Sequence, residues 1–210
     1  MPLLLVAIVT AVAGAVIALR LDSSHVVIDG LQKAGQLATA SEREVEEAIE
    51  QAGRVALVGG IARGLLLMPL LTLLLAVVLK IAAWLTAQKT LFMDLFTVAT
   101  LAMLPAGLAH FIEIFSALRL EVITPSMLPS LAPTSLAALT EASSPALGRV
   151  FHAVDIINIW CALVMGLGFA AASKLKPWKG ALFGLFLYAL FASAFTVGLP
   201  GLTPPGAGGH

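Results

Sequence analysis

Five stretches of this sequence are apolar over roughly twenty residues each, and no other feature restricts the fold as strongly. They cover residues 3–19, 64–85, 95–118, 156–173 and 180–199. About twenty consecutive apolar residues make an α-helix long enough to cross the ~30 Å hydrocarbon core of a bilayer. The sequence therefore predicts an all-α, polytopic membrane protein in which these stretches are five transmembrane helices of one membrane domain, residues 1–210.

The composition favours the same class of protein. Hydrophobic residues make up 60% of the chain and charged residues 11%, whereas a soluble domain is about 25% charged. Twelve basic and twelve acidic residues balance, so the net charge gives no indication of nucleic acid as a partner. The single cysteine, Cys161, lies inside the fourth apolar stretch, where a small buried side chain is its expected role.

The first apolar stretch has two interpretations, a cleaved signal peptide and a membrane span. A signal peptide begins with a positively charged segment, but Met1 and Pro2 precede the stretch without any Lys or Arg. Arg20 follows its end. We therefore expect a first transmembrane helix over residues 3–19.

A surface helix is expected to begin at Ser41 and to lead into the second span. Ser41 followed by Glu44 fits a capping box, and acidic residues in a first turn favour the helix dipole. The helix can continue into the apolar residues 64–85, which makes its first part amphipathic. Gly53, Gly59, Gly60 and Gly64 either weaken it or permit close helix packing, and Pro69 can bend it.

The remaining segments complete the expected organisation. Residues 120–150 form a loop rich in Pro, Ser and Thr, with a short helix expected around 134–142, and residues 200–210 form a disordered tail. Five lysines fall at the connections between spans two and three and between spans four and five: Lys80, Lys89, Lys174, Lys176 and Lys179. Basic residues in short loops mark the cytoplasmic side. The N-terminus is then cytoplasmic, and the 120–150 loop and the C-terminus are on the outer side, as expected for a bacterial inner-membrane protein.

Three polar pairs fall toward that outer side, each with a spacing of three residues. They are Glu47 and Glu50 before span two, His110 and Glu113 in span three, and His152 and Asp155 at the start of span four. On a helix this spacing puts two side chains on one face, and carboxylate with imidazole is typical of divalent-metal sites in helical bundles. The pattern predicts a metal site between spans, with Zn²⁺ as the first choice.

Other interpretations of these residues stay open. His110 and Glu113 could bond to each other or to Arg54 or Arg119, and Asp155 could cap its own helix. The glutamates of residues 42–50 could form a solvated face. A proton or ion pathway through the spans is a further alternative.

The chain resembles the bacterial branch of the Yip1 family. The resemblance covers residues 3–200 and is carried by the order of the spans, by KTLFMDLFTVATLAMLPAGL, and by VDIINIWCALVMGLGFAAASKLKPWKGAL. Asp155, Trp160 and Gly166 match the family pattern of the fourth span, and Ile157 stands where a phenylalanine is usual. The resemblance implies five spans with a cytoplasmic N-terminus. Eukaryotic relatives contact small prenylated GTPases, but this chain lacks their Asp-Leu-Tyr-Gly-Pro motif, so that partner is not expected here.

Three classes of function follow from these observations. The first is a non-enzymatic scaffold or membrane-organising protein, because the metalloprotease HExxH, the Gly-x-Ser-x-Gly elbow and the P-loop are absent from the sequence. Its expected partners are the lipid bilayer and further copies of the chain. The second is a protein that binds or transports a divalent metal. The third is a membrane-embedded enzyme that uses the metal to activate water.

Overall fold

The structure is a computed structural model that describes residues 1–138 and 145–194. Within these residues every regular element is a helix, and β-structure is limited to two isolated bridges. The expected all-α class is therefore confirmed. The chain divides into two compact units. Unit 1 contains residues 1–71 and 107–132, and unit 2 contains the described parts of 72–106 and 133–210.

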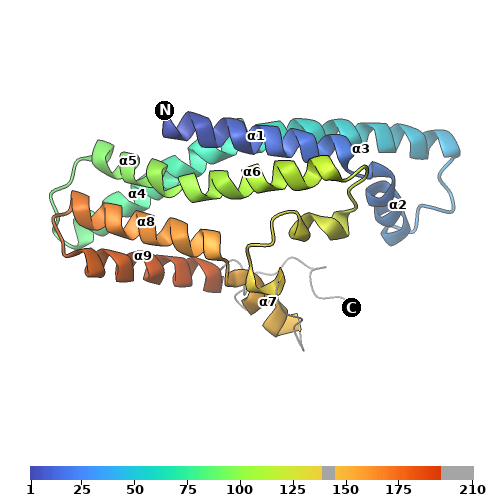
Figure 1. Ribbon diagram of the computed structural model, residues 1–210. Coiled ribbons are helices and arrows are strands. Elements are labelled where there is room, and N and C mark those ends of the chain that lie inside the picture. Colours follow the sequence, from blue (N-terminus) through green and yellow to red (C-terminus); the bar gives the residue numbers. More distant parts are fainter. Residues whose placement is uncertain (139–144, 195–210) are drawn as a thin grey trace. The chain divides into compact units, whose positions relative to one another are not determined.

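Unit 1 contains the N-terminal helices. They are α1 (Pro2–Arg20), α2 (Ser23–Lys33), α3 (Glu42–Ala62), the π-helix η1 (Arg63–Leu67), the start of α4 (Met68–Leu85), most of α6 (Leu104–Arg119) and the 3-10 helix η2 (Pro125–Ser130). The helix continues through Pro69, and the π-helical turn directly precedes this proline. Helices α1 and α3 lie side by side (Figure 1).

Unit 2 contains the remaining elements. They are the rest of α4, α5 (Phe92–Ala102), the 3-10 turn η3 (Leu136–Ala138), α7 (Pro145–Ala153), α8 (Ile156–Ala172) and α9 (Pro177–Phe191). Helix α8 packs on α9 and on α5 (Figure 1). A cluster of buried apolar side chains joins α4, α5 and α8, and Leu79, Leu95 and Phe169 are its largest fully buried members.

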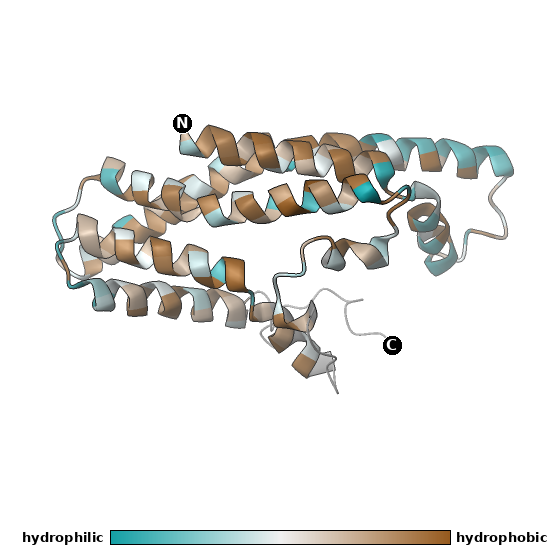
Figure 2. Cartoon of the chain, viewed as in Figure 1, coloured by the Kyte–Doolittle hydropathy of each residue, from teal (hydrophilic) through white to brown (hydrophobic). Residues whose placement is uncertain are grey.

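Three helical segments among the described residues are long and apolar enough to cross a membrane. They are Pro2–Arg20, Glu42–Leu85 and Phe92–Arg119, and Ile156–Ala172 is a shorter apolar helix. Apolar colour predominates on α1 and α6 in Figure 2, whereas hydrophilic colour gathers on α2 and on the first half of α3. Many large apolar side chains on these helices are exposed, Leu66 and Leu74 among them, as expected for surfaces that contact lipid.

The capping box at the start of α3 is confirmed. The Glu44 backbone N–H donates to the Ser41 hydroxyl, while the Ser41 backbone N–H donates to the Glu44 carboxylate at 2.8 Å. The helix continues from this cap into residues 64–85, as predicted. Residues 20–41 contain α2, which Asp22 caps by accepting from the backbone of Ser24 and His25.

The segment predicted as a span over 95–118 lies within the apolar helical segment Phe92–Arg119, in which α5 and α6 meet at Met103. Two expected boundaries need correction. The short helix expected around 134–142 is the 3-10 turn η3, and residues 139–144 lie outside the described part of the chain. The helix drawn through His152 and Asp155 is instead two helices, because α7 ends at Ala153 and Asp155 is the extended N-cap of α8. The end of the fifth expected span and the tail 200–210 lie outside the described residues.

Candidate functional site

The glutamates predicted to bind metal from the second helix are exposed and paired within that helix. Glu47 accepts from Arg43 at 3.1 Å, and Glu50 accepts from Arg54, each pair four residues apart. About two thirds of each carboxylate side chain is accessible. Pairs at this spacing stabilise a helix by a few tenths of a kcal/mol. The alternative of a solvated acidic face is therefore confirmed for these two residues.

His110 and Glu113 form a pair inside α6. The His110 Nδ1 lies 2.7 Å from a carboxylate oxygen of Glu113, and the imidazole side chain is 12% exposed. A bond of this length satisfies both polar groups in an apolar helix, where an unpaired carboxylate costs about 2.5–3.5 kcal/mol or more. The alternative in which the two side chains bond to each other is confirmed.

Asp155 is held by groups of its own unit. One carboxylate oxygen accepts from the Asn158 backbone N–H at 2.9 Å, and the other accepts from the Thr134 hydroxyl at 2.6 Å. The capping alternative for Asp155 is therefore confirmed. Because α7 ends at Ala153, His152 and Asp155 do not belong to one helix, and the predicted placement of both residues on a single helix was wrong. The side chain of His152 lies outside the described atoms.

The predicted ligands are divided between the two units. Glu47, Glu50, His110 and Glu113 belong to unit 1, and His152 and Asp155 to unit 2. Among the described residues there is no group of three or more His, Cys, Asp or Glu side chains that could hold a metal ion. The zinc site stays a prediction.

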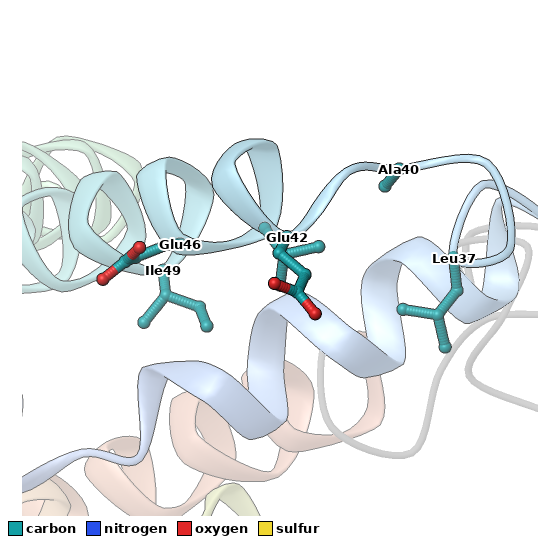
Figure 3. A pocket seen from close by; sticks show the side chains of 6 residues that line it. Leu37, Ala40, Glu42, Glu46 and Ile49 are labelled. Carbon is teal, nitrogen blue, oxygen red and sulfur yellow. The ribbon is translucent and has the colours of Figure 1, made fainter.

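A shallow pocket of about 430 Å³ lies in unit 1, where the segment after α2 turns into α3 (Figure 3). It is lined by Leu37, Ala40, Glu42, Val45, Glu46 and Ile49. The lining combines apolar side chains with two carboxylates four residues apart, and both glutamates are exposed. No hydroxyl, thiol or imidazole is among these lining side chains, so the pocket does not define a nucleophilic site.

The most constrained feature of unit 1 is a close contact between helix backbones, which we call the unit 1 seam: Ala11 and Gly14 of α1 against Gly60 of α3 and Gly64 of η1. A Cβ atom added to Gly14 would lie 2.5 Å from the Gly60 carbonyl oxygen. One added to Gly64 would lie 2.2 Å from the Ala11 backbone nitrogen. Only glycine permits such an approach, as in Gly-x-x-x-Gly helix contacts of membrane proteins.

Unit 2 has an equivalent contact, the unit 2 seam, between Ala162 and Gly166 of α8 and Gly180 and Gly184 of α9. A Cβ atom on Gly166 would lie 2.1 Å from the Gly180 carbonyl oxygen, and one on Gly184 would lie 2.1 Å from the Ala162 carbonyl oxygen. The four-residue spacing of small side chains on both helices was available in the sequence as a signal. Close packing was an alternative for Gly53, Gly59, Gly60 and Gly64, and it holds for the last two, whereas Gly14, Gly180 and Gly184 were not identified from the sequence.

Comparisons with protein-family models, with curated proteins and with solved structures find no match to this chain.

Proposed function

We propose that this chain is a multi-pass integral membrane protein with a non-enzymatic scaffold or membrane-organising role, of the Yip1 type. The observation that carries the proposal is the pair of glycine seams. Lipid is as apolar as leucine, so close van der Waals packing between small residues is a principal source of helix association in bilayers. Both units have small residues at such contacts.

The surface of the helices supports the membrane location. Three segments are long and apolar enough to cross a bilayer, and large apolar side chains such as Leu66, Leu74 and Phe186 are more than half exposed. Exposed apolar surface on this scale would be unfavourable in water. We propose a bacterial inner-membrane location with the lysines of both turns on the cytoplasmic side.

The scaffold role is favoured by the way in which the polar groups are used. Glu47, Glu50 and Asp155 bond to an arginine or to helix ends, and His110 bonds to Glu113. These hydrogen bonds and ion pairs stabilise helices. None of these side chains forms a pair of a nucleophile and a base.

Fractionation of cells that produce the full chain tests the membrane proposal. We expect the protein to stay in the membrane pellet after alkaline carbonate, because several apolar helices cross the bilayer. Release into the supernatant would contradict it.

Elemental analysis of the purified protein tests the scaffold proposal against the two metal-dependent alternatives. We expect less than one metal ion per chain after incubation with Zn²⁺ and buffer exchange. Stoichiometric zinc that Asp155→Asn or His110→Ala removes would favour a metal-binding or enzymatic function instead.

A further inference from the structure

The basic side chains of the two units have different partners. In unit 1, Lys33, Arg43 and Arg54 each form an ion pair with a carboxylate four residues earlier or later in the same helix. In unit 2, five exposed lysines form no ion pair with any described residue. These five are Lys80, Lys89, Lys174, Lys176 and Lys179, which we call the lysine cluster.

The lysine cluster lies in two turns and in the helices next to them, at the same end of unit 2: Lys80 belongs to α4 and Lys179 to α9. The turn from α4 to α5 and the turn from α8 to α9 are adjacent at one end of these helices (Figure 1). The helix ends that flank both turns pack into one buried cluster through Ala83, Leu95 and Phe169. Asp94, in the first turn of α5, is the carboxylate of these turns and is exposed. Among the described residues, five lysines and one carboxylate give this end an excess of positive charge.

Both turns have a defined backbone geometry. After α4, the Gln88 N–H donates to the Ala83 carbonyl at 2.8 Å, and after α8, the Leu175 N–H donates to the Ala170 carbonyl at 2.8 Å. In each turn the preceding residue, Ala87 or Lys174, has a left-handed conformation with φ of 55° or 53°. This is the Schellman pattern of helix termination. The lysines thus extend from ordered turns.

The same turns contain two hydroxyl groups without a described partner. Thr90 and Ser173 are each 6% exposed, and neither side-chain oxygen has a hydrogen-bond partner among the described residues. The Thr90 carbonyl accepts from the Lys80 ammonium at 2.6 Å. Buried hydroxyls in proteins nearly always have a partner, but these two oxygens are covered, so they do not contribute to a surface for a ligand.

Aromatic and aliphatic side chains surround the lysine cluster at its border with the helices. Trp84 is 76% exposed and Trp178 is 58% exposed. The Lys179 ammonium lies 5.7 Å from the centre of the Trp178 ring. Leu85 and Leu91 are also exposed beside the first turn. Tryptophan beside lysine is typical of the lipid headgroup level, whereas a site for a soluble anion has no need of exposed leucines around it.

We infer that the lysine cluster binds the headgroups of anionic phospholipids, with Trp84 and Trp178 at the boundary between headgroups and acyl chains. The inference rests on the proposed function, because it requires the helices of unit 2 to cross a bilayer. Each lysine near a membrane surface strengthens attraction to anionic lipid about fivefold. Phosphate oxygens would accept from the ammonium groups, and the acyl chains would lie along the exposed apolar side chains.

Lipid titration of the full-length protein, followed by native mass spectrometry, tests the inference. The variant Lys89→Gln/Lys176→Gln/Lys179→Gln removes three lysines and leaves Lys80 and Lys174, which take part in the turn geometry. The control Lys33→Gln/Arg43→Gln/Arg54→Gln makes the same charge change in unit 1. We expect wild type and control to retain phosphatidylglycerol in preference to phosphatidylcholine. We expect the first variant to bind phosphatidylglycerol on the order of 100-fold more weakly.

Three results would overturn the inference. They are equal retention of the two lipids by the wild type, an equal loss in the control variant, and displacement of phosphatidylglycerol by inorganic phosphate at similar concentration. The last would indicate a soluble anion as the ligand. Incorporation into nanodiscs is measured on the same samples. If the wild type enters bilayers without a lipid preference, only the inference of anionic-lipid binding is contradicted. If the wild type does not enter bilayers, the proposed membrane location is contradicted.

Discussion

In unit 1 a glycine seam joins α1 to α3 and η1 with few large side chains beside it, whereas in unit 2 the seam between α8 and α9 accompanies a core of large side chains. The buried cluster of unit 1 consists of Ala117, Ile123 and Leu131. That of unit 2 has nine buried members, among them Met165 and Phe169. The difference indicates that close contact between helix backbones contributes more to the packing of unit 1 than to that of unit 2, where large buried side chains contribute more.

Both units join a helix end to a distant segment by two backbone hydrogen bonds. In unit 1 the Ile123 N–H donates to the Arg20 carbonyl at 2.7 Å and the Asp22 N–H donates to the Ile123 carbonyl at 2.9 Å. In unit 2 the Leu136 N–H donates to the Val154 carbonyl at 2.8 Å and the Ile156 N–H donates to the Thr134 carbonyl at 3.0 Å. The units differ in the side chain that adds to these bonds: the Arg20 guanidinium donates to the Leu120 carbonyl in unit 1, whereas the Asp155 carboxylate accepts from Thr134 and from the start of α8 in unit 2.

The largest effect is expected from the core of unit 2. Phe169→Ala would leave a cavity beside Phe183, whose ring centre lies 4.7 Å from that of Phe169. We expect a loss of about 3 kcal/mol in unfolding free energy, at the low end of the ~3–5 kcal/mol range for such truncations. The free energy of transferring the side chain out of its surroundings is small when those surroundings are lipid and not water. Thermal or denaturant unfolding in nanodiscs measures it, with the exposed Phe186→Ala as control. Equal effects of the two substitutions would contradict the assignment of Phe169 to the core of unit 2.

The second prediction concerns the unit 2 seam. Gly180→Ala would place a Cβ atom 2.2 Å from the Gly166 carbonyl oxygen, so the helices must separate. We expect a loss of about 1–3 kcal/mol, as for other overpacked sites. Gly168→Ala is the matched control, because its Cβ would meet the Val98 side chain at 2.8 Å, and a side chain can adjust more easily than backbone. A larger loss of unfolding free energy for Gly168→Ala than for Gly180→Ala would contradict the close backbone contact in the unit 2 seam.

Asp155 provides a third, smaller test. Asp155→Ala removes the cap of α8 and the acceptor of the Thr134 hydroxyl, and we expect a loss of about 1–2 kcal/mol. Asp155→Asn keeps an oxygen acceptor and should retain most of the stability. The two unfolding curves, recorded with and without added Zn²⁺, separate capping from metal binding. A stabilisation by Zn²⁺ that Asp155→Asn abolishes would show that the residue is a metal ligand.

The smallest effect is expected at the start of α3 in unit 1. The backbone N–H and the hydroxyl of Ser41 donate to Glu44 and lower the pKa of its carboxyl below 4.5. A lowered folded-state pKa contributes stability above the unfolded pKa of 4.5, and this contribution is lost as pH falls through the lower folded value. The protection of the first turn of α3 against amide hydrogen exchange, relative to the intrinsic exchange rate at each pH, should therefore fall below pH 4.5. Glu44→Gln should remove this pH dependence, and its persistence in that variant would contradict the assignment.

Sequence patterns predicted the helical class well because apolar length and helix capping are local properties. The capping box at Ser41 and the continuation of α3 into α4 follow from residues that are neighbours in the chain. The break between α7 and α8 was missed because a helical spacing of His152 and Asp155 is also compatible with Asp155 as a cap. Spacing alone does not distinguish these alternatives.

The candidate metal site could not be derived for a related reason. The i,i+3 spacing of Glu47 and Glu50 places both on one helix, but the arginines four residues away compete for the same carboxylates. Which partner prevails depends on three-dimensional proximity to other helices, and that is a long-range property. The glycine seams, in contrast, leave a signal in the sequence. Gly60 and Gly64 are four residues apart, and so are Gly180 and Gly184.

The unfolding free energies of Gly60→Ala and Gly59→Ala, measured in the same nanodiscs, test the seams most directly. A Cβ atom on Gly60 would lie 2.6 Å from the Gly14 carbonyl group, whereas one on Gly59 would have no atom within 4 Å. The seam predicts a loss of about 1–3 kcal/mol for Gly60→Ala and a gain of up to about 1 kcal/mol for Gly59→Ala from helix propensity. Equal effects of the two substitutions, or a stable Gly60→Ala protein, would contradict it.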